Sequence, residues 1–124
     1  MNSQKKSILI VEDDKDSLEA LCSMLESLNY NSLPFASGRE ALHGLPGKKI
    51  DLALIDIMMP EMNGYEFLAE LRKIKEFQDT PVIMVTAKDG DNEILEGYQY
   101  GADYYITKPY TTKQLQYGIN LYLD

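Results

Sequence analysis

Short, continuously apolar runs recur along the chain at regular intervals. Four of them are SILIV at 7–11, DLALI at 51–55, PVIMV at 81–85 and DYYIT at 103–107. Runs of this length that do not alternate with polar residues are typical of parallel strands buried on both faces. A weaker fifth run is YNSLPF at 30–35, in which Pro34 favours the end or the edge of a strand. The pattern therefore predicts five strands.

Between these runs the apolar positions recur with a helical period. In residues 15–29 the leucines fall on one stripe, and Asp16 or Ser17 is a suitable N-cap. The same period predicts helices over 37–45, 64–75, 91–100 and 111–123. The second of these begins with Ser37 and, three residues later, Glu40, which is the sequence signature of a capping box.

Strand and helix thus alternate five times, with no long linker and no low-complexity segment. Such alternation predicts an α/β fold in which helices cover both faces of a parallel sheet. The 124 residues suffice for one ordinary domain with its own core, and no boundary separates two. We therefore expect residues 1–124 to form a single domain.

The charge balance narrows the range of partners. The chain has 20 acidic and 12 basic residues and a formal net charge of −8 at pH 7. A domain this acidic repels the phosphate backbone, so we expect no direct binding to nucleic acid. No apolar run approaches the ~18 residues of a membrane span, and MNSQKKS at the start lacks the apolar stretch of a signal peptide. Together with the single cysteine, Cys22, which excludes an intrachain disulfide, these features favour the cytoplasm and no membrane partner.

The third apolar run ends abruptly in a carboxylate. Asp56 follows Ile55 directly, and the loop after it holds Pro60 and the turn pair Asn63-Gly64. Aspartates near loops are commonly turn formers, but these three residues already supply a turn. A chemical role for Asp56 is therefore the better interpretation.

Polar groups with useful chemistry also stand directly after three other predicted strands. Glu12 and Asp13 follow the first strand, Thr86 the fourth and Lys108 the fifth. In a doubly wound sheet, ligands bind beyond the carboxyl ends of the strands. If these strands are neighbours of the one that ends in Asp56, all five side chains converge on one rim.

This combination of groups suits phosphoryl transfer. Clustered carboxylates repel one another unless a cation intervenes, and Mg²⁺ favours one or two carboxylates together with water and phosphate oxygens. A carboxylate can attack phosphorus to form an aspartyl phosphate, while a metal, a lysine and a hydroxyl bind the phosphoryl oxygens. We therefore predict that Asp56 is phosphorylated, with Mg²⁺ as the cofactor.

The motifs that carry these residues resemble those of a known family. They are ILIVEDD, LALIDIMMPEMNG, PVIMVTA and GADYYITKPY, which span residues 8–110 in the family's order and spacing. The chain resembles the receiver domain of two-component response regulators, the CheY-like family. The resemblance implies a flavodoxin-like (βα)5 fold with a five-stranded parallel sheet in the order 2-1-3-4-5.

The resemblance also implies a role for each matching residue. Asp56 is the implied phosphoacceptor, and Lys108 pairs with its phosphate. Asp13 is implied to ligate Mg²⁺ directly, with Glu12 acting directly or through water. Asp56 itself and the backbone carbonyl of Met58 complete the implied protein ligands.

Two further residues belong to the implied switch. The Thr86 hydroxyl is expected to swing toward the phosphoryl group, and the Tyr105 ring is expected to move inward with it. The Lys108–Pro109 peptide bond is expected to be cis.

The implied function is a signalling switch of a two-component system or phosphorelay. A histidine kinase or histidine phosphotransfer protein donates the phosphoryl group, and the protein turns over no metabolite, so we do not class it as an enzyme. Seven of the nine tyrosines lie after residue 97, on the fourth helix, fifth strand and fifth helix. Tyrosines are enriched on recognition surfaces, so an output protein is expected to bind this Tyr-rich face.

Receivers of the OmpR type, which are joined to winged-helix DNA-binding domains, usually differ here. They carry a second Asp after GAD and arginines along the last helix, which pair across a symmetric dimer. In this chain Tyr104 replaces that Asp, and Gly118 and Asn120 stand near the arginine positions. These differences disfavour that mode of dimerisation.

Three other functions compete with the switch. A phosphohydrolase of the haloacid-dehalogenase kind needs a second Asp two residues after its nucleophile, where this chain has Met58. A flavodoxin-type carrier needs a hydroxyl- or glycine-rich loop after the first strand, and EDDKD would repel the phosphate of FMN. A phosphorylation-independent, receiver-like scaffold is the remaining alternative, although every residue that the switch requires is present.

Overall fold

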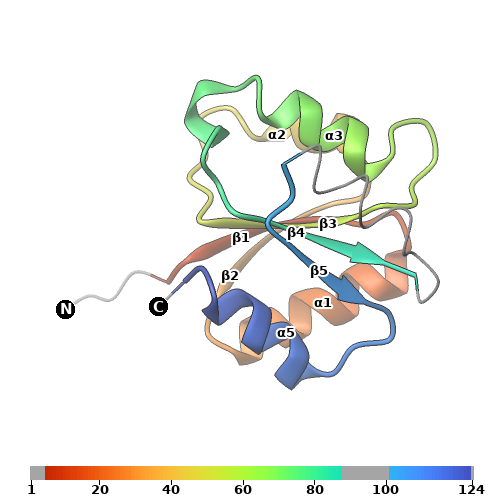
Figure 1. The fold of residues 1–124 in the computed structure, drawn as a ribbon, viewed down its shortest axis with the longest axis vertical. Helices are drawn as coiled ribbons and strands as arrows, with labels where there is room; N and C mark the ends of the chain where they lie inside the picture. Colours follow the sequence, from red (N-terminus) through yellow and green to blue (C-terminus); the bar gives the residue numbers. More distant parts are fainter. Residues whose placement is uncertain (1–4, 88–100, 124) are drawn as a thin grey trace.

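The computed structural model describes residues 5–87 and 101–123, which form alternating strands and helices (Figure 1). The strands are β1 (Ser7–Val11), β2 (Asn31–Phe35), β3 (Leu52–Asp56), β4 (Val82–Thr86) and β5 (Tyr104–Thr107). The helices are α1 (Lys15–Ser27), α2 (Gly38–Gly44), α3 (Gly64–Leu71) and α5 (Thr112–Asn120), with a 3-10 turn at Lys75–Phe77. The helix expected over 91–100 lies outside the described residues. Within the described ranges, no helix is both long and apolar enough to cross a bilayer.

All five strands of the described part run parallel in one sheet, in the order β2-β1-β3-β4-β5. The chain starts at β1, places β2 on one side of it, and then builds β3, β4 and β5 on the other side. Where the winding changes direction, such sheets bind ligands beyond the carboxyl ends of their strands. The predicted fold class is confirmed.

A hydrophobic cluster covers each face of the sheet. Side chains alternate along each strand: in β1, Ile8 and Ile10 belong to one cluster, whereas Leu9 and Val11 belong to the other. The helices α1 and α5 cover the face of Ile8, and α2 and α3 cover the opposite face (Figure 1). Because both faces are covered, the central strands are buried along nearly their whole length, as their continuous apolar runs predict.

The two edge strands are less buried. Every residue of β2 is exposed or half-buried, and the strand contains Pro34, as expected for an edge. The expectation that β5 is buried on both faces is wrong, since Ile106 is its one buried residue. The physical reason is that β5 has β4 as its only neighbour in the sheet. Tyr104 and Tyr105 are both half-buried and pack against opposite clusters.

Side chains just before the helices fix their first turns. The carboxylate of Asp14 accepts a hydrogen bond from the backbone N–H of Ser17, so Asp14 caps α1 and the expectation of Asp16 or Ser17 is wrong. Residues 12–17 are all polar and several offer similar capping chemistry, so the sequence does not show where the backbone turns. Thr111 caps α5 in a capping box that it forms with Gln114.

The pair Asn63-Gly64 begins α3 rather than forming an isolated turn. Asn63 is the N-cap and shares a capping box with Glu66. A Cβ on Gly64 would lie 2.6 Å from the carbonyl oxygen of Asp56 and 2.8 Å from Cα of Ile57. The start of α3 is therefore packed directly against the end of β3, where the candidate phosphoacceptor stands.

Replacing Gly64 with alanine tests this close approach. We expect Gly64→Ala to lower the free energy of unfolding by about 1–3 kcal/mol, the usual cost of overpacking, because a new Cβ meets backbone atoms that cannot rotate away. Gly118→Ala is the matched control: its Cβ would meet side-chain atoms of Tyr104 and Ile106 at 3.2 and 3.3 Å. Urea denaturation measures both variants, and equal losses of stability would contradict the argument.

Candidate functional site

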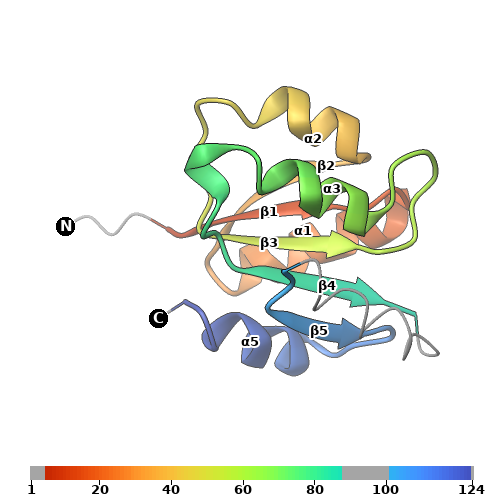
Figure 2. The ribbon, with the colours of Figure 1, turned by 45° about the horizontal axis from the view of Figure 1, so that its top comes forward.

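The strand order brings the predicted site residues to one end of the sheet. Glu12 directly follows β1, Asp56 ends β3, and Thr86 ends β4. Lys108 directly follows β5, and the four strands are successive neighbours. In Figure 2 the arrows of β3, β4 and β5 point toward this end of the molecule.

Lys108 connects two buried carboxylates from strands that are far apart in the sequence. Its Nζ donates to Oε1 of Glu12 at 2.8 Å and to Oδ2 of Asp56 at 3.3 Å. Glu12 is only 4% exposed and Asp56 only 8%, so these contacts form largely out of water. Charge-assisted hydrogen bonds of this kind are stronger than neutral ones.

The other carboxylate oxygens of this pair are also bonded. Oε2 of Glu12 accepts a hydrogen bond from the backbone N–H of Asp14 at 3.0 Å. Oδ1 of Asp56 accepts one from the backbone N–H of Met58 at 3.2 Å. Each carboxylate is therefore held in a fixed orientation by the loop that follows its own strand.

Glu12, Asp13 and Asp56 together form a group that could hold a metal ion. Each offers one carboxylate oxygen, and these oxygens lie within 4.8 Å of one another. The donors are all hard oxygen atoms, which suit Mg²⁺ or Ca²⁺ rather than a metal that prefers sulfur or nitrogen. Asp13 is the exposed member, so the group opens to solvent on one side.

The charges in this group are unbalanced, and the pKa values reflect it. Burial, together with the neighbouring Glu12, raises the pKa of Asp56 to about 6. Burial also acts to raise the pKa of Glu12, but hydrogen bonds from Lys108 and from Asp14 outweigh it and hold that pKa below its usual value. Burial opposes the charge of Lys108, yet the two carboxylates raise its pKa. Without a further cation, Asp56 is thus the carboxyl group that most readily keeps a proton.

The remaining predicted site residues surround this group. The Met58 side chain is 65% exposed, while its backbone bonds to Asp56. Thr86 is 1% exposed, and its hydroxyl lies 3.4 Å from the carbonyl oxygen of Ala87, which is a long hydrogen bond. The Lys108–Pro109 peptide bond is cis.

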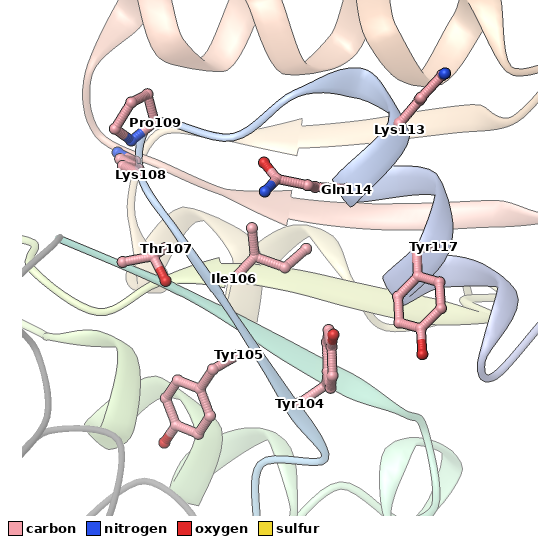
Figure 3. A pocket seen from close by; sticks show the side chains of 9 residues that line it. All are labelled: Tyr104, Tyr105, Ile106, Thr107, Lys108, Pro109, Lys113, Gln114 and Tyr117. Carbon is pink, nitrogen blue, oxygen red and sulfur yellow. The ribbon is translucent and has the colours of Figure 1, made fainter.

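A cavity lies beside β5 and α5 rather than over Asp56. Its volume is about 660 Å³, and Tyr104, Tyr105 and Tyr117 contribute to its lining (Figure 3). The Tyr104 ring packs over Gly118, where a side chain would meet it at 3.2 Å. Tyr98 and Tyr100 of the predicted Tyr-rich face lie outside the described residues.

Sequence reasoning missed a groove that adjoins the site on its other side. About 490 Å³ in volume, it runs along α1 past Ser17, Ala20 and Met24 to Lys108 and Tyr110. The sequence does contain small and flexible residues at helical spacing on α1, at the positions that line this groove. Such spacing alone does not show which part of the molecule they face. The groove places an accessible apolar surface next to the lysine of the site.

Comparisons with known proteins agree with the fold. The family model "Response regulator receiver domain" matches residues 8–120. The transcriptional regulatory protein YvrH of Bacillus subtilis is 37% identical over 121 residues, covering 97% of this chain and 50% of its own length. Chemotaxis protein CheY4 of Vibrio cholerae has a similar structure, with a TM-score of 0.92 and 27% identity, over 97% of this chain and 100% of that one.

A third similar protein bears on the metal. It is the receiver domain of sensor histidine kinase PA1611 from Pseudomonas aeruginosa, whose structure has a magnesium ion coordinated in the active site cleft. It has a TM-score of 0.87 and 27% identity, over 96% of this chain and 98% of that one. This chain spans about half the length of the curated relatives that it matches.

The raised pKa of Asp56 predicts a pH-dependent cost to folding. Because the folded-state pKa of about 6 lies above the ordinary 3.8, the ionised carboxylate opposes folding. That penalty is complete above the folded-state pKa and disappears as the pH falls below the ordinary value. We therefore expect Asp56→Asn to raise the free energy of unfolding by about 1–3 kcal/mol near neutral pH, and by progressively less toward about pH 4.

Urea denaturation in the presence of a chelator measures this difference. Asp79→Asn, which removes an exposed carboxylate before β4, is the control and is expected to change stability little at any pH. A gain for Asp56→Asn that is independent of pH would contradict the assigned pKa.

Proposed function

The chain belongs to the response regulator receiver domain family, and from this premise we propose that it is a phosphorylation-controlled switch whose phosphoacceptor is Asp56. The observation that carries the proposal is the buried Asp56 carboxylate, which lies 3.3 Å from the Lys108 ammonium with Glu12 and Asp13 beside it. A nucleophile, a cation for the phosphoryl oxygens and a set of metal ligands are what phosphoryl transfer to a carboxylate requires.

The proposed reaction moves a phosphoryl group from a phosphohistidine to Asp56. A carboxylate oxygen of Asp56 attacks phosphorus, and the P–N bond to the donor's imidazole breaks as the new O–P bond forms. The electron pair of the P–N bond stays on the imidazole nitrogen, which takes a proton. Lys108 already lies between Glu12 and Asp56, so its ammonium is placed to pair with the transferred oxygens.

The same group of carboxylates is proposed to hold Mg²⁺. Asp13, Asp56 and the backbone carbonyl of Met58 would be its protein ligands, with Glu12 acting directly or through water. Bound there, the ion supplies positive charge that offsets the carboxylates and the phosphoryl oxygens. Support comes from the three carboxylate oxygens within 4.8 Å of one another and from the magnesium ion in the similar PA1611 receiver domain.

The phosphodonor is proposed to be a histidine kinase or a histidine phosphotransfer protein. Such a partner must bring its histidine to Asp56, and the groove along α1 ends at Lys108 beside the site. Apolar contacts in this groove would hold the donor, while the exposed acidic residues at the start of α1 flank it. A cytoplasmic location belongs to the same proposal, since a kinase's cytoplasmic part is the expected donor.

Phosphorylation is proposed to act through Thr86 and Tyr105 on the Tyr-rich face. The Thr86 hydroxyl has only a long hydrogen bond to Ala87, so a phosphoryl oxygen can compete for it. Tyr105 lies on β5 beside Met84 of β4, two pairs from Thr86 in the register. An output protein would recognise the change around Tyr104, Tyr105 and Tyr117, and these acidic 124 residues would not bind nucleic acid directly.

In this proposal residues 1–124 act as one receiver domain. The protein catalyses its own phosphorylation and dephosphorylation and transforms no metabolite, so it is a switch rather than an enzyme in the usual sense. A phosphorylation-independent scaffold is the alternative. The buried Lys108 contacts to Glu12 and Asp56 disfavour it, because a scaffold has no use for two costly buried carboxylates.

Incubation with acetyl phosphate tests the central reaction. We expect the intact mass of the protein to rise by one phosphoryl group when Mg²⁺ is present, and not to rise when a chelator replaces it. Asp56→Asn should show no gain, whereas Asp79→Asn should behave as the unmodified protein. No gain in the folded, unmodified protein would favour the scaffold instead.

Substitution of Thr86 tests the coupling separately from the chemistry. Thr86→Val keeps the shape but loses the hydroxyl, and we expect Asp56 to accept the phosphoryl group at a rate within about tenfold of the unmodified protein. The amide NMR shifts of Tyr104–Thr107 on phosphorylation should shrink in this variant and persist in Thr86→Ser. Unchanged shifts in Thr86→Val would remove Thr86 from the proposed switch.

A further inference from the structure

The end of the sheet opposite Asp56 carries a second charged pocket. It has a volume of about 370 Å³ and is lined by Lys5, Lys6, Ser7, Asn31, Lys49 and Asp51. In Figure 2 the starts of β1 and β3 lie together at the end from which the arrows point away. We propose that this pocket binds a small anion with two or more phosphate groups, independently of the state of Asp56.

Backbone hydrogen bonds give this pocket a fixed frame. Oδ2 of Asp51 accepts a hydrogen bond from the backbone N–H of Ser7 at 2.8 Å, and the N–H of Asp51 donates to the carbonyl of Ser7 at 2.8 Å. The N–H of Asn31 donates to the carbonyl of Lys6 at 2.9 Å. Three segments far apart in the sequence are therefore held in register, and each contributes polar side chains to one cavity.

The lysines of this pocket do not serve as counter-ions for its one carboxylate. Asp51 accepts a hydrogen bond from the N–H of Ser7 at the start of β1, and Asp103 accepts one from the N–H of Val82 at the start of β4. The Asp103 carboxylate also has a cation nearby, since Arg72 lies 3.6 Å from it. Among the described residues Asp51 has no such ion pair, and neither do the three pocket lysines. In a chain with 20 acidic and only 12 basic residues, three lysines that converge without an acidic partner favour an external anion.

The lining restricts the class of ligand. Lysine ammonium groups bind phosphate as point charges, and the Asn31 amide and the Ser7 hydroxyl add neutral donors. Among the described residues no aromatic side chain lines the pocket, so none of them would stack on a nucleotide base there. Three ammonium groups against one carboxylate match a ligand with several negative charges better than a single phosphate. The geometry therefore points to adjoining phosphate groups as the recognised feature.

Titration of the ¹⁵N-labelled 124-residue chain with sodium tripolyphosphate tests the proposal. We expect saturable shifts of the Ser7, Asn31 and Asp51 amide signals, and the same affinity in Asp56→Asn. Sodium sulfate at matched ionic strength should produce no saturable shift. Equal shifts with sulfate, or shifts centred on Glu12 and Lys108, would overturn the proposal.

Matched variants separate the pocket from general charge. We expect the triple variant Lys5→Gln, Lys6→Gln and Lys49→Gln to bind tripolyphosphate about tenfold more weakly or worse, since it removes the three ammonium groups at once. The corresponding triple arginine variant keeps the three positive charges and should retain binding. It therefore shows whether the glutamine variant loses binding through lost charge or through impaired folding.

A second set of substitutions with the same change in net charge completes the test. Lys73→Gln, Lys75→Gln and Lys113→Gln together lie outside the pocket and should change the affinity by no more than about twofold, because distant charges are screened. Equal weakening by both glutamine sets would overturn the site. Binding of the chain to vesicles with phosphorylated lipid headgroups, without saturable binding of tripolyphosphate, would also overturn it in favour of a membrane surface.

Discussion

Two carboxylates that share one ammonium group at the end of a buried sheet constrain the rest of the site. Glu12 and Asp56 are both nearly inaccessible to water, and the single positive charge of Lys108 can balance only one of their two negative charges. The lysine lies closer to Glu12, which keeps its charge, while the pKa of Asp56 rises to about 6. The structure thus stores a local excess of negative charge that a divalent cation would relieve, and it places that excess on the proposed nucleophile.

The pleat of the strands places the proposed phosphoacceptor and the proposed switch residues on opposite faces of the sheet. Side chains two residues apart face the same side of a sheet, so Asp56 follows Leu54, and Lys108 follows Ile106, toward the side of α1 and α5. By the same alternation Thr86 follows Met84, and Tyr105 also packs there, toward the side of α2 and α3. The proposed phosphoryl group on Asp56 would therefore have to be detected across the sheet, and Thr86, which ends the neighbouring strand, is the residue proposed to detect it.

The sequence predicted correctly which residues stand at the strand ends. It did not predict features that depend on neighbours in the folded structure, such as the exposure of a strand. Continuous apolar runs identified β1, β3 and β4. The residues that follow the first two runs gave the carboxylate group, and the residue after the third run is Thr86. The exposure of β5 could not be predicted in this way, because it depends on β5 having one neighbour rather than two. Asp14 was missed as the cap of α1 for a related reason, since consecutive polar residues offer equivalent caps until the backbone direction is known.

At both ends of the strands, backbone N–H groups donate hydrogen bonds to carboxylates, but the two ends differ in how many carboxylates they gather. At the carboxyl ends, backbone N–H groups of the following loops orient carboxylates, as Met58 does for Asp56 and Asp14 for Glu12. At the amino ends, the first N–H of a strand needs an acceptor, and an aspartate from the loop before the adjacent strand supplies it, as Asp51 does for Ser7. One rim therefore gathers carboxylates that need a cation, while the other needs only one carboxylate per strand start and leaves its lysines available. In this chain the carboxylate group therefore lies at one end of the strands and the lysine pocket at the other.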